Sequence, residues 1–544
     1  MTHDRPGRLR PASSLALVLT VAAVSSVSSA CGGAASGDAR GGTGTPKSGG
    51  NLRFAVGTDA GCLDPQQVGS SDTLYALRQT VDSLTDQDPS TGRIVPWLAK
   101  SWEVSDKART FTFRLRPGAT FSDGKPVDAE AVKKNLDAIP RLGGLAILAQ
   151  GYLTGYRGTR VVDKLTAEVT FDRPNAQFLQ ATSTPSLGLV SPADTARTAQ
   201  RRCGDGVHGS GPFTVSGYRQ NQSLTLKKRT GYAWGSTAWK KKGAAYLDSV
   251  TFSVVAEAGV RAGSLGSGQA DVIGGVRRQD EGVLRRGGAG VERRANPGVV
   301  FNLGFNNGRP LTRDLRVRQA AQAAINRAEI AGAVFPTGTR AATSVLSRTT
   351  PGYTDLSKDL TYDRDKAKSL LSEAGWKPGG DGIRRKDGKP LKLTVVSFSK
   401  AGSYEAALEL VQQQLKDVGI ALVIKRLEVT QFPQTLRTGD YDALWGGDLT
   451  RADPDALRTL YSTHLVNSYR LPGGALDTAL DEQAATTDTA RRNQLVAKAQ
   501  QLIVRAAYVL PIVDQETLVG VAGGVHGLTL GASGGVRLHD TWKS

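Results

Sequence analysis

Few residues of this chain have the types and spacing that catalysis would need. Residues Gly531 to Gly535 (GASGG) match the G-x-S-x-G nucleophile elbow of serine hydrolases. That motif requires a strand, a sharp turn and a helix, followed by an acid and a histidine, but only nine residues follow Gly535. We therefore expect the match to be fortuitous.

Other catalytic and cofactor motifs are also missing from the sequence. The five histidines are dispersed, at positions 3, 208, 464, 526 and 539, with no pair at metal-ligand spacing. Neither the P-loop nor the dinucleotide-binding glycine motif occurs. Asp453 and Asp455 form a carboxylate pair, but nothing marks them as acid and base. The sequence predicts no enzyme, no catalytic residues, no metal site and no cofactor.

Length and charge narrow the classes further. A chain of 544 residues exceeds one ordinary core, so we expect two or three substructures. The net charge of +19 comes from short, separated groups, not from one patch with aromatic platforms, so we expect no nucleic-acid partner. These groups are either ordinary surface or, alternatively, a face for an anionic partner. They are Arg201-Arg202, Lys227-Lys228, Lys240–Lys242, Arg277-Arg278 and Arg384–Lys386.

The N-terminus has the three-part layout of a secretory signal. Met1–Arg10 carries three arginines, Leu15–Val27 is apolar, and Ser28-Ser29-Ala30 precedes Cys31. Small residues before a cysteine resemble a bacterial lipobox, although Ser28 stands where Leu or Val is usual. We predict a lipid on Cys31; alternatively, the protein is secreted and Cys31 is incidental. No later segment approaches about 18 consecutive apolar residues, which excludes a polytopic membrane protein.

Residues 32–50 consist almost entirely of Gly, Ser, Thr, Ala and Pro, the composition of a flexible tether. A tether behind an anchoring cysteine predicts a globular body held at the outer face of the cell membrane. Only Cys62 and Cys203 remain, in an oxidising compartment that permits a disulfide. We predict that they form one; the alternative is two buried thiols.

The mature chain mixes strands and helices, which indicates α/β layers. Asp72–Leu84 has helical spacing, Arg109–Leu115 alternates like a half-buried strand, and a helix begins at Asp128. Further strands are expected at Ala167–Phe171, Ser223–Lys227, Val250–Val255 and Val299–Phe305. Further helices are expected at Val317–Ile330, Arg364–Ala374, Tyr404–Asp417 and Ala490–Ala506.

A long series of short motifs resembles one family in order. The motifs are Gly49–Arg53, Leu63–Pro65, Pro96–Trp102, Phe111–Gly118, Phe121–Pro126, Asp128–Val132, Gly209–Phe213, Gly304–Asn307, Arg316–Ala320, Ala324–Arg327, Tyr362–Asp363, Leu370–Trp376, Gly419–Ile420, Gly439–Asp442 and Leu510–Pro511. Together they resemble the extracytoplasmic solute-binding proteins of ABC importers, in the peptide/nickel-binding family 5. The likeness spans about residues 48–530. Asn326 departs from it, because the family typically has Asp before this Arg.

The resemblance implies a two-lobed α/β periplasmic-binding-protein fold, class II and large type, with an extra subdomain in lobe one and a hinged ligand cleft. The expected divisions are a lipoprotein signal peptide (1–30), a tether (31–50), the lobe-one main subdomain (51–90 and 205–298), the extra subdomain (91–204), lobe two (299–508) and a return to lobe one (509–544). Cargo bound to both faces of the cleft would favour the closed form.

The resemblance also suggests where cargo binds. In peptide-binding members a Trp-x-x-Asp places its carboxylate on the α-ammonium of the peptide, and Trp445 and Asp448 match that spacing. Alternatively, Asp448 caps a turn or pairs with Arg451, and Trp445 fills the lobe interface. The remaining candidates for the cleft wall are Tyr75, Asn306, Asn307 and Phe432.

The function that the resemblance implies is capture of oligopeptides or dipeptides outside the membrane and delivery to an ABC permease by hinge closure. The partners would be the cargo, the transmembrane subunits of the permease and, through the lipid on Cys31, the membrane; we expect a monomer. Alternatives are a nickel chelate, an oligosaccharide or an opine as cargo, a secreted hydrolase, or a ligand sensor without transport.

Overall fold

The structure, a computed structural model, describes residues 44–399, 404–428, 431–465 and 467–544. The predicted signal segment and Cys31 lie outside the described residues. Gly44–Ser544 forms one unit by its internal contacts. None of the helices in the described ranges is long and apolar enough to span a membrane.

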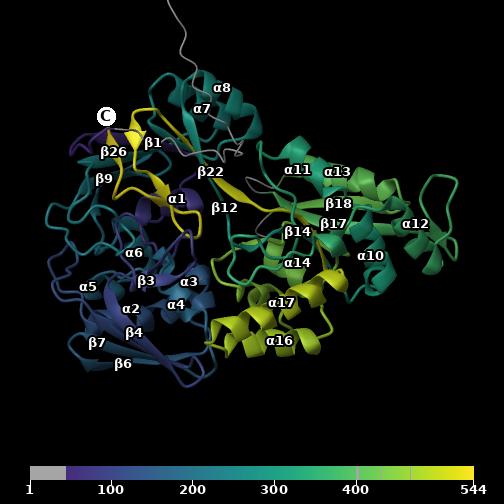
Figure 1. The fold of residues 1–544 in the computed structure, drawn as a ribbon, viewed down its shortest axis with the longest axis horizontal. Coiled ribbons are helices and arrows are strands. Elements are labelled where there is room, and N and C mark those ends of the chain that lie inside the picture. Colours follow the sequence, from purple (N-terminus) through teal and green to yellow (C-terminus); the bar gives the residue numbers. More distant parts are fainter. Residues whose placement is uncertain (1–43, 400–403, 429–430, 466) are drawn as a thin grey trace, which may run out of the picture. The chain divides into compact units, whose positions relative to one another are not determined.

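A seven-stranded mixed sheet organises what we call the first lobe (Figure 1). Its order is β12 (Gly290–Ala295), β22 (Glu516–Val521), β11 (Val272–Gly274), β1 (Asn51–Val56), β10 (Ser249–Val254), β9 (Ser223–Lys228) and β8 (Phe213–Arg219). Strand β1 runs parallel to β10 and β11, and it buries Leu52, Phe54 and Val56 in the lobe core. The helices of the first lobe are α1 (Ser71–Leu77), α6 (Ala199–Asp205), α7 (Ala258–Gly266) and α8 (Glu281–Arg286).

Helix α1 ends well before the predicted boundary at Leu84. The backbone N–H groups of Gln79 and Thr80 donate to the carbonyls of Ala76 and Leu77, which tightens the last turn. The Thr80 hydroxyl also donates to the Leu77 carbonyl, 2.8 Å away. These local bonds terminate the helix although its apolar spacing continues to Leu84.

A four-stranded antiparallel sheet forms a separate subdomain, named here the four-stranded subdomain. Its order is β4 (Ala99–Ser105), β5 (Thr110–Leu115), β7 (Thr166–Phe171) and β6 (Tyr156–Asp163), with α2 (Ala129–Ala138) packed on it. The predicted strands at Arg109–Leu115 and Ala167–Phe171 are confirmed. The predicted cap is confirmed as well, because the Asp128 carboxylate accepts from the Ala131 N–H at 2.9 Å.

A five-stranded sheet organises the second lobe. Its order is β18 (Ala421–Glu428), β17 (Lys392–Ser399), β19 (Ala443–Trp445), β14 (Phe301–Phe305) and β21 (Val509–Val513). The main helices of this lobe are α10 (Leu315–Ala324), α11 (Arg327–Val334), α12 (Arg364–Glu373), α13 (Glu405–Lys416), α16 (Ala475–Ala484) and α17 (Thr489–Arg505). The helices expected near Arg364, Tyr404 and Ala490 are confirmed as α12, α13 and α17.

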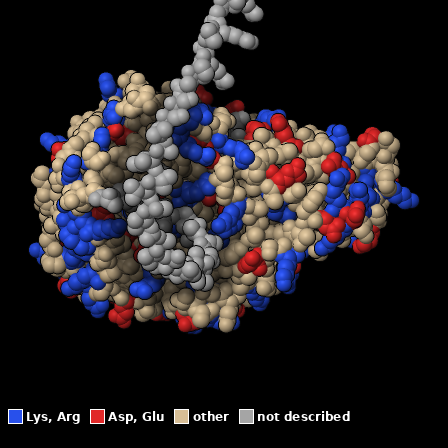
Figure 2. Space-filling model, turned by 45° about the horizontal axis from the view of Figure 1, so that its top comes forward, with Lys and Arg blue, Asp and Glu red and all other residues tan. Residues whose placement is uncertain are grey.

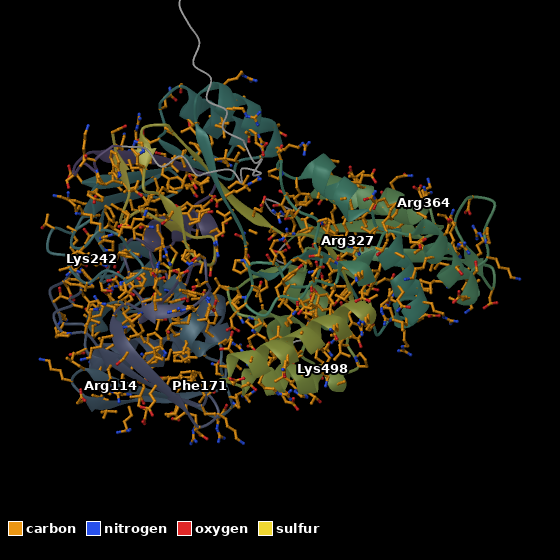
Figure 3. The ribbon with its side chains drawn as sticks, in the orientation of Figure 1. Arg114, Phe171, Lys242, Arg327, Arg364 and Lys498 are labelled. Atoms are coloured by element: carbon orange, nitrogen blue, oxygen red, sulfur yellow. A yellow bond between two sulfur atoms is a disulfide. The ribbon has the colours of Figure 1, made fainter. Side chains whose placement is uncertain are left out.

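The single helix predicted over Val317–Ile330 is wrong, because the chain forms α10 and α11 with a break at Ile325. Ile325 is extended, and the Asn326 side chain caps α11 by accepting from the Glu329 N–H. Arg327 then turns inward, where its guanidinium donates to the carbonyls of Pro511, Leu360 and Ile325 at 2.7–3.2 Å. Figure 3 shows Arg327 among the elements of the second lobe.

Two chain segments connect the sheets of the two lobes. One runs from β12 to β14 through residues 296–300, and the other runs from β21 to β22 through residues 514–515. The segments touch, because the Asn296 N–H donates to the Gln515 carbonyl at 2.7 Å. Arg348 and Arg293 contact the carboxylates of Asp514 and Glu516 beside this point, at 2.6 and 3.4 Å.

The shorter elements are β2 (Thr85–Gln87), β3 (Ile94–Pro96), α3 (Ile147–Tyr152), α4 (Phe178–Ala181), α5 (Pro192–Thr195), β13 (Gly298–Val299), α9 (Pro310–Arg313), β15 (Arg385–Lys386), β16 (Lys389–Pro390), α14 (Phe432–Thr438), β20 (Leu449–Thr450), α15 (Ala456–Tyr461), β23 (Val525–His526), β24 (Thr529–Leu530), β25 (Val536–Arg537) and β26 (Trp542–Lys543), with 3-10 turns at Ile139–Ala146, Pro185–Leu187, Arg278–Asp280 and Ser357–Leu360.

Cys62 and Cys203 form a disulfide with their Cα atoms 4.1 Å apart. The bond joins the chain just before α1 to α6, and the Leu63 N–H also donates to the Cys203 carbonyl. On the outside, Figure 2 shows Lys and Arg spread over the face in view, with Asp and Glu among them.

Candidate functional site

The G-x-S-x-G match lies in a hairpin. Gly531 and Gly535 close the turn between β24 and β25 through a 2.7 Å backbone hydrogen bond. Strand β25, not a helix, follows the serine, so the strand–turn–helix setting of a nucleophile elbow is missing. His539 is buried beside Trp239, and its Nε2 lies 2.8 Å from the Gly243 carbonyl.

The carboxylate pair belongs to a buried scaffold. Arg492 contacts Asp453 at 2.6 Å, and Arg458 contacts Asp455 at 2.9 Å. All four side chains lie in the turn after β20 and the adjoining helices, where each charge is neutralised by its partner. In the described part of the chain, no group of three or more His, Cys, Asp or Glu could hold a metal ion.

The loop between β19 and β20 presents the Trp-x-x-Asp motif. Gly446 adopts φ +89°, a conformation that few residues other than glycine tolerate, and its N–H donates to the Asn302 carbonyl at 3.0 Å. The Asn302 side chain donates to the Gly447 carbonyl at 2.8 Å. A Cβ on Gly447 would overlap the Tyr469 hydroxyl, so two consecutive glycines let the loop pack tightly beneath Asp448.

The Asp448 carboxylate is partly exposed, and its charge acts on three tyrosines. Burial raises the pKa of Tyr404, Tyr461 and Tyr469, and the negative charge of Asp448 raises each of these pKa values further. The three residues come from separate places, before α13, at the end of α15 and in the loop after it. The charge of Asp448 therefore acts on phenol groups from three separate parts of the second lobe.

Two buried polar atoms near this loop have no hydrogen-bond partner among the described residues: Tyr461 Oη and Asn302 Oδ1. Native proteins satisfy most buried polar atoms, so such exceptions often mark positions that water or a ligand completes. Tyr461 Oη belongs to a tyrosine whose pKa is raised in part by the Asp448 charge. Asn302 Oδ1 belongs to the side chain that donates a hydrogen bond to the Gly447 carbonyl.

Trp445 ends β19 and is 5% exposed. Its ring meets Phe301 edge-on, with centroids 4.8 Å apart, and Phe301 in turn contacts Tyr404 at 5.1 Å. The indole thus packs against the aromatic part of the second-lobe core and shares it with one of the tyrosines around Asp448.

The other predicted wall residues have different surroundings. Asn306 donates to the carbonyls of Gly439 and Tyr441, both at 3.0 Å. Asn307 donates to the Phe305 and Tyr469 carbonyls. Asn306 thereby orders the turn before β19, and Asn307 orders the backbone that carries Tyr469.

Tyr75 lies on α1 in the first-lobe core, stacked on Phe54 at 5.9 Å. Phe432 is the first residue of α14, and its side chain lies outside the described residues. The structure places Trp445 at the end of β19 and Asp448 in the loop that follows, with Asn307 bonded to the Tyr469 carbonyl nearby, and it places Tyr75 in the other lobe.

Arg451 is a residue whose surroundings sequence reasoning missed. Its Nη1 donates to Gln177 Oε1 at 3.0 Å and to Thr459 Oγ1 at 2.7 Å, and its guanidinium lies 4.6 Å from the Tyr152 ring centre. Gln177 and Tyr152 belong to the four-stranded subdomain, so Arg451 joins the second lobe to that subdomain. The three tyrosines were missed too, since nothing local in sequence links them to Asp448.

Comparisons with known proteins agree with this architecture. The family described as bacterial extracellular solute-binding proteins, family 5 Middle, matches residues 93–467, more than half of the chain. The chain is 26% identical over 501 residues to di/tripeptide-binding protein 1 of Pseudomonas aeruginosa (strain UCBPP-PA14), covering 85% of this chain and 88% of that protein. It is also 26% identical over 454 residues to the nickel-binding periplasmic protein of Escherichia coli (strain K12), covering 77% and 81%.

The crystal structure of NikA from Brucella suis in complex with Fe(III)-EDTA has the same fold, with a TM-score of 0.79 at 22% identity, covering 91% of this chain and all of that one. The two-lobed α/β fold expected from the resemblance is confirmed. The chain belongs to family 5 of the bacterial extracellular solute-binding proteins, the peptide- and nickel-binding family of ABC transporters.

Proposed function

We propose that this protein is the lipid-anchored receptor of an ABC importer that captures peptides with a free α-amino group and delivers them to its permease. The carrying observation is the Asp448 carboxylate, which follows the tightly packed Gly446–Gly447 turn and whose charge acts on three tyrosines. An α-ammonium is the chemical partner that such a carboxylate favours, through charge-assisted hydrogen bonds.

The relatives support this cargo class, since one is named for di- and tripeptides. A nickel chelate is the second candidate, supported by the name of the other relative. An anionic chelate would meet the negative charge of Asp448, whereas a peptide ammonium would neutralise it. The site therefore favours the peptide.

The test compares the two forms of one peptide. Asp448→Asn should weaken binding of a free-amine tripeptide by about 10- to 100-fold, because a hydrogen bond to a charged group contributes about 1.5–3 kcal/mol. Binding of the N-acetylated tripeptide should change little. Calorimetry on both peptides measures the effect, after mass spectrometry of any solute released from the purified protein. Equal losses for the two peptides would contradict the assignment.

Delivery and anchoring complete the proposal. A monomer tethered by residues 32–50 and by acyl chains on Cys31 would stay close to the permease at the outer face of the membrane. Mass measurement of the N-terminal peptide from the membrane fraction tests the anchor, and an unmodified Cys31 would indicate plain secretion.

A further inference from the structure

The strongest unassigned feature is the burial of the Arg451 guanidinium between the second lobe and the four-stranded subdomain. Arg451 is 3% exposed, and its partner Gln177 is 2% exposed. The Tyr152 ring lies against one side of the guanidinium, and Gly151, next to Tyr152, lies beside its Nη2. The arginine thus fits a slot formed at the end of α3 and the start of α4.

The buried Arg451 guanidinium lacks part of the hydrogen bonding that it would have in water. The contacts of Arg451 are with neutral groups, the Gln177 and Thr459 oxygens and the Tyr152 ring, and its Nε is buried without a hydrogen-bond partner among the described residues. An amide oxygen, a hydroxyl and a ring face compensate only part of the hydration that a buried guanidinium loses. Such a contact would stabilise a closed form only modestly, because the guanidinium would regain its hydration in an open form.

Arg451 is also connected in two ways to the loop between β19 and β20 that carries Asp448, named here the cargo loop. Along the chain it stands three residues after Asp448, just beyond β20. Through space it donates to Thr459 on α15, the helix that ends with Tyr461 beside the Asp448 charge. A displacement of the cargo loop or of α15 therefore moves Arg451 as well.

Two further hydrogen bonds join the same faces. Gln87 Nε2 donates to the Ala452 carbonyl at 3.0 Å, and the Ala176 N–H donates to the Ala484 carbonyl at 2.9 Å. Both lie next to the Arg451 contact in sequence, at Ala452 and at Ala176. The three contacts form what we call the interlobe seam, and Arg451 is the charged member of the three.

We infer that Arg451 is the closure latch of this receptor: a positioning residue that couples cargo on Asp448 to the closed arrangement of the second lobe against the four-stranded subdomain. The inference rests on the proposed function for its cargo, but not for the seam itself. Cargo that orders the β19–β20 loop and α15 also orders Arg451 in its slot, and the seated arginine then slows cargo release.

The experiment measures closure and release separately. Dyes placed at Arg114→Cys on β5 and Lys498→Cys on α17, which Figure 3 labels, report the closed-to-open ratio by single-molecule energy transfer. Stopped-flow fluorescence gives the dissociation rate of tri-alanine and of its N-acetylated form. The variants are Arg451→Met, Gln177→Ala and the double substitution. Arg364→Met serves as the control, because Arg364 is half exposed and pairs with Asp417 inside the second lobe.

Arg451→Met should lower the closed-to-open ratio about tenfold and raise the dissociation rate by a similar factor, with the preference for the free amine unchanged. Gln177→Ala should act in the same direction, and the double variant should be no worse than Arg451→Met alone. Unchanged ratio and rate in Arg451→Met, or fully additive effects, would overturn the latch. If wild-type protein binds neither tripeptide, the peptide proposal fails, and the closed-to-open ratio still decides the latch.

Discussion

At the scale of single residues, Gly447 leaves no room for a side chain next to the candidate cargo site. A Cβ there would overlap the Tyr469 hydroxyl and come within 2.8 Å of Asn302 Oδ1. We expect Gly447→Ala to displace the turn that carries Asp448, to weaken peptide binding at least tenfold and to lower the free energy of unfolding by about 1–3 kcal/mol.

Calorimetry and urea unfolding measure both effects of this substitution. Gly535→Ala is the matched control, since Gly535 is exposed and no atom lies within 4 Å of the added Cβ. Unaltered peptide affinity in Gly447→Ala would show that the turn does not position Asp448.

Asp82 is a buried carboxylate of the first lobe that should make stability depend on pH. Burial raises its pKa to about 7, against the opposing effects of Arg78 and of hydrogen bonds from Trp234 and Tyr232. Since the folded pKa lies above the ordinary value, the folded state binds the proton more tightly. The contribution of Asp82 to stability is full below about pH 4 and is lost as the pH rises toward 7.

Urea unfolding between pH 4 and 8 tests this expectation on wild type and Asp82→Asn. The asparagine keeps an acceptor for Trp234 but does not titrate. Wild type should lose stability relative to Asp82→Asn across that range. A constant difference between the two proteins would mean that Asp82 does not titrate there.

At the scale of elements, Arg327 fixes α11 to the edge of the second-lobe sheet. Its guanidinium holds the Pro511 carbonyl of β21 and the carbonyls of Leu360 and Ile325, and burial lowers its pKa to about 10. Arg327→Met should lower the free energy of unfolding by about 2–4 kcal/mol, because buried carbonyls lose their charged donor.

Urea denaturation measures this loss, and Arg327→Lys, which keeps a charged donor, should fall between Arg327→Met and wild type. The exposed pair of Arg364 with Asp417 supplies the comparison, since Arg364→Met should cost less than about 1 kcal/mol. Similar losses for Arg327→Met and Arg364→Met would contradict the anchoring role.

The elements that sequence predicted well are those that local chemistry defines. Helix α12 begins after an aspartate whose carboxylate caps it, and Gly375 ends it at φ +86°. The break between α10 and α11 was missed because the apolar spacing runs through it. That break depends on Arg327 reaching β21, a contact between residues far apart in the chain.

In the candidate site too, sequence predicted the residues that a local motif defines and missed those that contacts distant in the chain bring together. The family motif located Trp445 and Asp448, because their spacing is a local property of one loop. Tyr404, Tyr461 and Gln177 reach that region from other elements, and no residue pattern in the sequence records those meetings. Asn306 was predicted as a cleft residue, and the structure shows its amide engaged with backbone carbonyls.

At the scale of the whole molecule, the disulfide closes a long loop. Cys62 and Cys203 are separated by 141 residues, a span that includes the entire four-stranded sheet. In the chain-entropy treatment, closing a loop of this length restricts the unfolded chain enough to stabilise the fold by about 4–5 kcal/mol. Guanidinium unfolding with and without a reductant should show a loss of that order.

The double variant Cys62→Ala/Cys203→Ala is the companion measurement, since it should match the reduced protein and be insensitive to reductant. Cargo affinity should remain close to that of wild type, because neither cysteine lies near Asp448 in the second lobe. Unfolding curves that coincide with and without reductant in wild type would show that the two thiols are not joined.

The two connecting segments at Asn296 and Gln515 are bonded to each other, and this has a mechanical consequence. Two bonded connections at one point favour a hinge rotation of one lobe relative to the other and oppose a shear motion between them. If the lobes open as the proposed function requires, we expect the opening to be a rotation about this point, so that the angle of rotation sets the size of the cargo that can enter.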